Sequence, residues 1–354
     1  MPSLCASLST PLSSSREDLV FCAAFALAWE ELRARFGPIR MEPQPALADA
    51  LNAAPLGAEV VDPAWSVSGA GFGGEGIVEA LRAELSSKFP DAKPEYLPEA
   101  VPAEDLIAYG YLSKILKFGT TFAVREGTFK RSRVRAFGLD GSPFGPDPAR
   151  RSQVVVHDWA APQDFVLELV ADDPDSRVVV AQIAPAETLA ATVASALGRL
   201  DRLGGAERQL AKDEALSIPR LKLDLAAVFG DLIGRPLLGE VLKGKRFGEA
   251  KQRVQFHLNE GGAGATSEAV IGSYGPPPPR SFQVTAPFLV LLQRRGASAP
   301  YLAAWVESTT WMEVLGDVAP PAAPPAGWGA PAGWGPPSGF GPPPGFGPPP
   351  SGAT

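Results

Sequence analysis

The sequence has few of the residues on which most catalytic and metal chemistry depends. Among 354 residues there are two histidines, His157 and His257, and two cysteines, Cys5 and Cys22. Each histidine lies in a strand-like run without a neighbouring nucleophile, and His157-Asp158 is interpreted as the end of a strand. No residue spacing is typical of a metal site, and two cysteines exclude a disulfide framework. We therefore expect a protein that is not an enzyme and that has no cofactor.

Concentrated positive charge and long apolar runs are also absent. The net charge is −7 and the pI is near 5.1, whereas nucleic-acid binding needs a concentrated basic surface. The densest basic run, Lys130 to Arg135, is interpreted as the solvent face of a strand. No secretory signal precedes Arg16, and the apolar run from Leu19 to Trp29 is too short to span a bilayer. The sequence predicts a cytoplasmic protein that binds neither nucleic acid nor membrane, with nonclassical export as the alternative.

The last segment of the chain has a different composition from the rest. From Val318 to Thr354 there is no charged residue, Gly-aromatic-Gly recurs every six residues, and 13 of the 38 prolines lie there. Such a segment has no periodic apolar face, so burial cannot offset its ordering entropy. We predict a domain over residues 1–315 and a disordered, partly polyproline-II tail over 316–354. The tail is either passive or a site of partner binding or self-association.

The remaining pattern predicts an α+β fold. Helices are expected at 17–36, 77–89 and 186–202, and the glycine-rich stretch 69–76 is interpreted as a plain loop. Strands are expected at 106–112, 132–137, 153–157, 165–170, 177–183, 219–225, 251–258, 282–292 and 300–307. Strands in runs, with helices clustered elsewhere, indicate α+β architecture rather than a regular βαβ repeat.

Several segments follow one another in a recognisable order. They are LIAYGYLSKILKFGTTF (106–122), FVLEL followed by RVVVAQIAP (165–185), IPRLKLDLAAVFGDLIG (218–234), NEGGAGATS (259–267) and FQVTAPFLVLLQ (282–293). Together they resemble the serpin family of protease inhibitors. The fourth is similar to the hinge before the family's reactive loop, and the fifth to the Pro-Phe-Leu strand after it. The 27 residues from Glu260 to Pro287 are the separation of a full-length serpin loop.

The resemblance implies a divergent serpin-like domain with a shortened N-terminal half. Its expected parts are a large mixed sheet, further antiparallel sheets, peripheral helices and an exposed reactive loop. The implied hinge residues are Glu260, Gly261, Gly262, Ala263, Gly264, Ala265, Thr266 and Ser267. The implied partner is a target protease of the serine or cysteine class.

In the serpin mechanism a protease cuts the loop, whose N-terminal part then inserts into a sheet as a central strand and traps the acyl-enzyme. Alternate side chains of such a strand enter the core. Counted from Gly262, one alternating set is small or apolar: Ala263, Ala265, Ser267, Ala269, Ile271 and Ser273. The other set is Gly264, Thr266, Glu268, Val270 and Gly272, so that the only charge faces solvent. Proline lacks the N–H that a central strand donates, so insertion can extend to Gly275 and is blocked at Pro276.

The position of the cleaved bond stays open. The candidates are Pro276-Pro277, which has the family spacing, Tyr274-Gly275 and Arg280-Ser281. The first is a poor substrate for a serine protease. The second would suit a chymotrypsin-like enzyme and the third a trypsin-like one, but each is offset from the family position. An offset favours plain cleavage over trapping, because trapping is a race between insertion and deacylation.

Three interpretations therefore compete for the whole chain. It is a protease inhibitor acting by loop insertion, a non-inhibitory relative, or a scaffold that works through the tail from Gly316. A fourth, that 261–272 is only a flexible linker, explains neither the alternation of side chains nor the strand motifs on both sides.

Overall fold

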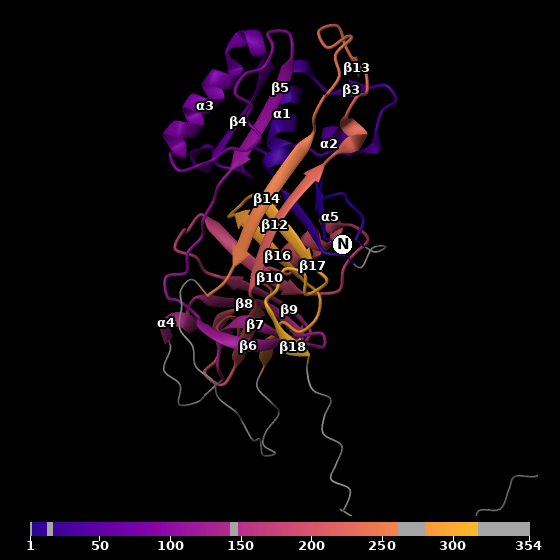
Figure 1. Ribbon diagram of the computed structural model, residues 1–354. Coiled ribbons are helices and arrows are strands. Elements are labelled where there is room, and N and C mark those ends of the chain that lie inside the picture. Colours follow the sequence, from indigo (N-terminus) through magenta and orange to yellow (C-terminus); the bar gives the residue numbers. More distant parts are fainter. Residues whose placement is uncertain (1, 13–16, 142–147, 261–279, 318–354) are drawn as a thin grey trace, which may run out of the picture. The chain divides into compact units, whose positions relative to one another are not determined.

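The computed structural model describes residues 2–12, 17–141, 148–260 and 280–317 (Figure 1). Its largest layer is a seven-stranded sheet in the order β1-β2-β17-β16-β10-β9-β8. These strands are β1 (Ser3–Cys5), β2 (Leu19–Cys22), β8 (Val154–Ala161), β9 (Asp164–Leu169), β10 (Ser176–Gln182), β16 (Phe288–Arg294) and β17 (Leu302–Val306). β1 and β2 are parallel and the other pairs are antiparallel. The strands β2, β16 and β17 are buried on both faces, so this sheet forms the centre of the main hydrophobic core.

A five-stranded sheet is built around β7 (Ser132–Leu139). Two strands share one edge of β7: β18 (Val314–Asp317) pairs with its first half and β11 (Ala215–Pro219) with its second half. β6 (Ala123–Phe129) pairs along the other edge. β15 (Ser281–Gln283) pairs in parallel with β11. Of the basic run Lys130 to Arg135, only the part from Ser132 lies in β7, where Arg133 is exposed and Val134 is buried; Lys130 and Arg131 form the turn between β6 and β7, so the predicted strand face is corrected for these two residues.

Two antiparallel two-stranded sheets lie in the upper half of Figure 1. One pairs β4 (Ser66–Phe72) with β5 (Leu106–Leu112), and the other pairs β12 (Leu221–Val228) with β14 (Lys251–Leu258). The helices α1 (Ala24–Phe36) and α3 (Ile77–Lys88) pack on the first of them. A short pair of β3 (Arg40–Met41) and β13 (Leu237–Leu238), with α2 (Ala46–Ala53), completes a second hydrophobic cluster against α1.

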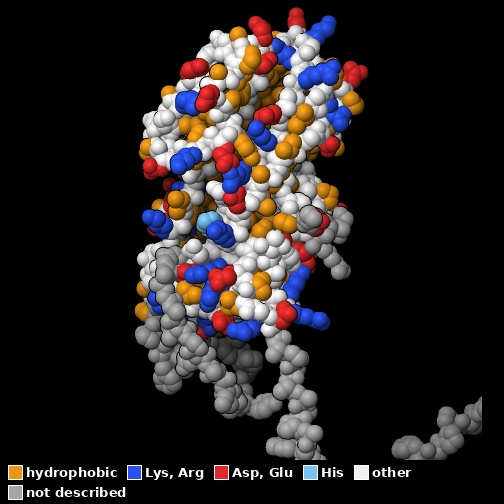
Figure 2. Space-filling view, in the orientation of Figure 1, with side chains coloured by type: hydrophobic (Ala, Val, Ile, Leu, Met, Phe, Trp, Pro, Cys, Tyr) orange, Lys and Arg blue, Asp and Glu red, His pale blue; other side chains and the backbone are white. Residues whose placement is uncertain are grey.

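The remaining helices are short. They are α4 (Pro148–Arg151), α5 (Leu189–Leu197) and the 3-10 turns η1 (Pro63–Trp65), η2 (Gly73–Glu75), η3 (Gly205–Arg208) and η4 (Gly230–Leu232). Within the ranges given above, no helix is long and apolar enough to cross a membrane. Figure 2 shows acidic and basic side chains mixed over the visible face, without a continuous basic area.

The structure confirms the α+β class and the large mixed sheet, and it corrects two local predictions. The expected helix at 17–36 begins as the strand β2, because LVFC extends the central sheet beside β17 before α1 starts at Ala24. The stretch 69–76 is not a plain loop, since its first half belongs to β4. A side chain at Gly69 would meet Leu81 and Ile77 of α3 at 3.2–3.3 Å, so glycine allows α3 to pack closely on this strand.

The chain separates into two units after Asp317. Gly316 and Asp317 pair with β7 as part of β18, so the folded part continues two residues beyond the predicted boundary at 315. The predicted tail from Val318 onward lies outside the described residues.

Candidate functional site

β14 leads directly into the predicted hinge. Its sequence KQRVQFHL alternates strictly, with Gln252, Val254, Phe256 and Leu258 buried and the residues between them exposed or half-buried. β12 has the same alternation in its first half, and the two strands pair from Leu221 opposite Leu258 to Val228 opposite Lys251. One face of this ribbon therefore packs on the core while the other faces solvent.

β5 is held in place by a close contact with α1. A Cβ atom at Gly110 would lie 2.1 Å from the backbone oxygen of Ala24, so only glycine permits this approach of helix and strand. On the other face of the ribbon, Tyr109 of β5 packs with Val67 of β4 and with Leu81 and Leu85 of α3. β5 is thus packed between two helices.

β5 and β14 run in the same direction. Before the two strands, the Lys245 ammonium donates to the backbone oxygen of Glu104. After them, the backbone N–H of Phe122 donates to the backbone oxygen of Glu260 at 3.1 Å. The segments before the two strands are therefore bridged to one another, and so are the segments that follow them, although β5 and β14 themselves form no ladder with each other.

Each of these two strands keeps one edge without a ladder in the part of the chain that the structure describes. β5 pairs with β4 alone, and β14 pairs with β12 alone. An unpaired edge presents a row of N–H and C=O groups that another strand can bind. The pair of edges is the central feature of the candidate site.

Glu260, the first residue of the predicted hinge, is fixed where β14 ends. Its carboxylate accepts a two-pronged pair of hydrogen bonds from the Arg220 guanidinium, whose Nε lies 2.6 Å from Oε2. The Glu260 side chain is 5% exposed and that of Arg220 is 27% exposed. A forked ion pair with one nearly buried partner is directional and strong, so it sets the point from which the following segment departs.

The connection from α3 to β5 crosses onto the solvent face of β14. Arg253 of β14 bonds both Glu95 of this connection and Asp224 of β12, and the Lys251 ammonium lies 4.9 Å from the Tyr96 ring centroid. The hydrogen bonds from Arg253 and Gln255 lower the pKa of Asp224 to about 2. Residues 95 and 96 therefore form a clasp between the two ribbons.

The far end of the loop is anchored separately. Arg280 forms an ion pair with Glu214, and Ser281 enters β15 opposite Ala215. Of the predicted site residues, Glu260, Arg280 and Ser281 are thus placed at two different strand ends. Gly261, Gly262, Ala263, Gly264, Ala265, Thr266, Ser267, Tyr274, Gly275, Pro276 and Pro277 lie outside the described residues.

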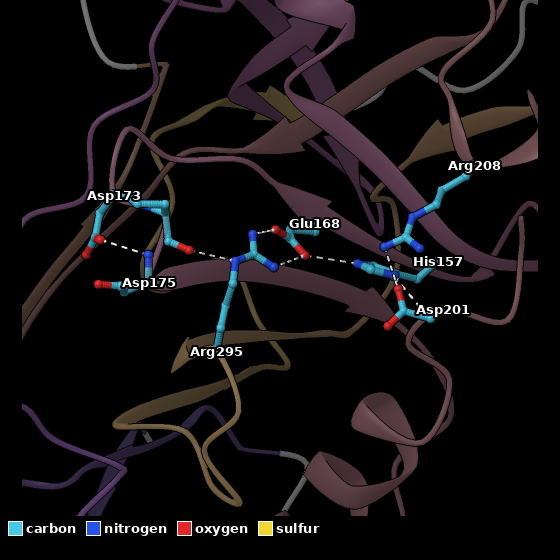
Figure 3. Close-up of polar contacts among 8 residues, drawn as sticks. His157, Glu168, Asp173, Asp175, Asp201, Arg208 and Arg295 are labelled. Carbon is cyan, nitrogen blue, oxygen red and sulfur yellow. Dashed lines mark hydrogen bonds and ion pairs between the residues drawn. The ribbon is translucent and has the colours of Figure 1, made fainter. Parts of the chain in front are cut away.

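His157 belongs to a buried polar network and not to a strand end. It lies inside β8, next to a register shift between Val156 and Asp158. Figure 3 shows Glu168 between the imidazole of His157 and the guanidinium of Arg295. The backbone N–H of Asp201 donates to Nδ1 at 3.0 Å, so Nε2 carries the proton and donates to Glu168 Oε2 at 3.1 Å.

This network joins four parts of the chain. Burial raises the pKa of Glu168, but the hydrogen bonds from His157 and Arg295 outweigh it and lower the pKa to about 2. Glu168 is therefore a carboxylate that holds β8, β9 and the turn after β16 together. In the described ranges, no group of His, Cys, Asp and Glu side chains is arranged to hold a metal ion.

Several residues of the site were not predicted from the sequence. Arg220, Glu214 and Phe122 contact the ends of the loop, and Glu95 clasps β14. Each is separated from its partner by at least 40 residues. The one available signal was the strict alternation of 251–258, which places Arg253 on the solvent face but does not name its partner.

Comparison with known proteins gives matches among solved structures. No family model matches the chain, and no curated protein matches it. Serpin48 of the insect Tenebrio molitor is 16% identical with a TM-score of 0.36, and the match covers 66% of this chain and 65% of that one. Uncleaved ovalbumin is 10% identical (TM-score 0.43; 83% and 94% covered), and mouse protein-Z dependent protease inhibitor is 12% identical (0.46; 82% and 91%). These proteins belong to the family that the sequence motifs resemble.

Proposed function

We propose that the protein is a serpin-like inhibitor of serine or cysteine proteases, in which the segment after Glu260 adds as a strand to the edges of β5 and β14. The observation that carries the proposal is that β5 and β14 run in the same direction, each with one unpaired edge among the described residues, and that the segments before and after them are bridged. The segment 262–275 follows directly from β14 and has side chains that alternate as a central strand requires.

The lengths of the parts are compatible. β14 has eight residues and spans about 27 Å, and the fourteen residues from Gly262 to Gly275 reach about 46 Å when extended. A chain that turns back at the hinge would run antiparallel to both strands. At about 1 kcal/mol net for each backbone hydrogen bond, with side-chain burial in addition, insertion would release on the order of ten kcal/mol.

The proposal is tested by cleavage and stability together. The full chain is incubated with serine and cysteine proteases of different primary specificity, and products are examined for an SDS-stable complex. Cleavage within 262–279 is expected to raise the midpoint of thermal unfolding by more than about 10 °C, because the freed segment joins the sheet. Cleavage without a complex but with this rise would assign the protein to the non-inhibitory relatives.

A matched pair of variants makes this test specific for the strand register. Ala265→Glu places a charge on the inward set, so cleavage should no longer raise the unfolding midpoint. Thr266→Glu places the same charge on the outward set and should leave the rise intact. Equal behaviour of the two variants, or no rise in the unmodified protein, would refute insertion.

A second candidate function is binding through the proline-rich tail. It is favoured by the position of this segment in the chain, since it follows in sequence on β18 of the five-stranded sheet. Its Gly-aromatic-Gly units have the chemistry of ligands for aromatic-lined grooves or of self-associating stickers. Deletion of 318–354 should abolish such binding or self-association, measured by sedimentation velocity, and leave protease reactions unchanged.

A further inference from the structure

The segment between β14 and β15 has a single basic residue. From Glu260 to Ser281 the sequence contains Arg280 and no other Lys or Arg. Trypsin-like proteases cleave after Arg or Lys, because a carboxylate in their specificity pocket binds the basic side chain. Arg280-Ser281 is therefore the one bond in this segment at which an enzyme of that class could react.

Arg280 is already bound inside the protein. Its Nε and Nη2 donate to the two carboxylate oxygens of Glu214 at 2.5 and 3.2 Å. Nη1 and Nη2 donate further to the backbone oxygens of Glu207 and Gln209 at 3.0 and 3.4 Å. The Glu214 side chain is 6% exposed and that of Arg280 is 20% exposed. All three guanidinium nitrogens are thus used.

The residues after the bond are also held in the fold. Ser281 pairs with Ala215 in β15, and Phe282 is fully buried with its ring 5.4 Å from that of Phe165. The guanidinium of Arg280 also lies 5.5 Å from the centroid of the Phe282 ring. A protease must bind residues on both sides of the bond that it cuts, so it would have to pull β15 away from β11.

Glu214 is fixed independently of Arg280. Its Oε2 accepts from the backbone N–H of Ala211 at 2.8 Å, and its backbone oxygen accepts from Arg151 at 3.0 Å. The Glu214 carboxylate is therefore oriented before Arg280 binds it. Glu214 is thus a preformed receptor for the Arg280 side chain.

We propose that Glu214 and Arg280 form a tether that ends the reactive segment at residue 279 and makes the protein inert to trypsin-like proteases at this bond. The inference deepens the function proposed above, on which it rests, because it excludes one class of target enzyme. Arg280 is a structural anchor of β15, and the specificity of the segment is determined by the residues before it, none of which is basic.

The tether is tested by mapping tryptic cleavage in the folded full chain. Short digestions at low trypsin concentration are followed by intact-mass spectrometry, and the rate of cleavage at Arg280-Ser281 is extracted from its two fragments. In the unmodified protein this bond is expected to survive. Glu214→Gln should raise its cleavage rate by about tenfold or more, because cleavage follows the population in which the segment is open.

Two further variants separate the tether from a general loss of stability. Glu207→Gln is the matched control, since Glu207 contributes its backbone oxygen, which the substitution retains, and its cleavage rate should equal that of the unmodified protein. Arg280→Lys keeps a tryptic site and its charge but loses the fork, so it should be cut faster, as Glu214→Gln is. If Glu214→Gln does not fold by circular dichroism, Arg280→Lys alone decides the outcome.

Rapid cleavage of the unmodified protein at Arg280-Ser281 would overturn the proposal. So would equal rates in the unmodified protein, Glu207→Gln and Arg280→Lys. Because the readout is the rate of cutting at one bond, it does not depend on any SDS-stable complex. Failure of strand insertion and failure of the tether are thus recognised by different measurements.

Discussion

The forked ion pair of Arg220 and Glu260 allows us to predict how much stability is lost when the first residue of the predicted hinge loses its partner. Arg220→Met keeps most of the side-chain volume and removes the guanidinium, which leaves the Glu260 carboxylate without a countercharge at 5% exposure. Removing one partner of a buried ion pair costs about 3–5 kcal/mol. Since Arg220 is 27% exposed, solvent reaches one side of the pair, and we expect about 2–3 kcal/mol.

That loss corresponds to a fall of about 3–5 °C in the midpoint of thermal unfolding for a folded unit of this size, measured by circular dichroism. The control is Arg133→Met, because Arg133 and Glu126 form an ion pair whose side chains are 48% and 54% exposed. Its midpoint should stay within about 1 °C of the unmodified protein. Combining Arg220→Met with Glu260→Gln should recover part of the loss, since the buried charge is then absent. Equal shifts for the two arginine variants, or full additivity in the double variant, would refute the buried-pair argument.

Three other measurements follow from the structure. The pKa of Glu168 is lowered to about 2 from an ordinary 4.5, so its contribution to stability is complete above pH 4.5 and is lost as the pH falls toward 2. In the unmodified protein the free energy of unfolding in urea should therefore fall by a few kcal/mol over that window because of this group. Glu168→Gln should remove this part of the pH dependence. Burial raises the pKa of Cys5 to about 12 and that of Cys22 to about 11, so neither thiol should react with a disulfide reagent at pH 8 until urea unfolds the chain. Gly110→Ala should destabilise the protein by at least about 2 kcal/mol in urea titration, because its Cβ would meet the α1 backbone, whereas Gly248→Ala, with no atom within 4 Å, should not.

The strands were predictable wherever their pattern was local. The segment 251–258 alternates so regularly that its predicted bounds are those of β14, and 106–112 agrees with β5. The same local reasoning failed at LVFC, where continuous apolar residues fit a buried strand as well as a helix. It failed also for β4, whose glycines lower strand propensity but are required by the packing of α3.

The site itself was predictable only in part. The resemblance predicted Glu260 as the first hinge residue, and the structure shows this residue bound to Arg220 just after the end of β14. Which charge lies opposite which depends on contacts between distant parts of the chain, so the pairs of Glu214 with Arg280 and of Glu95 with Arg253 could not be read from one sequence. For the same reason His157 was interpreted as a strand end, although Glu168 and Asp201 enclose it.

The arrangement of β18 beside β11 has a mechanical consequence. A pull on the chain beyond Asp317 would load β18 in shear against Ser132 to Val134 of β7, and the next residues of that same edge hold β11. β11 in turn carries β15, where the segment from Glu260 ends. Tension applied at the C-terminus therefore has a continuous route of strand pairs to the far anchor of that segment.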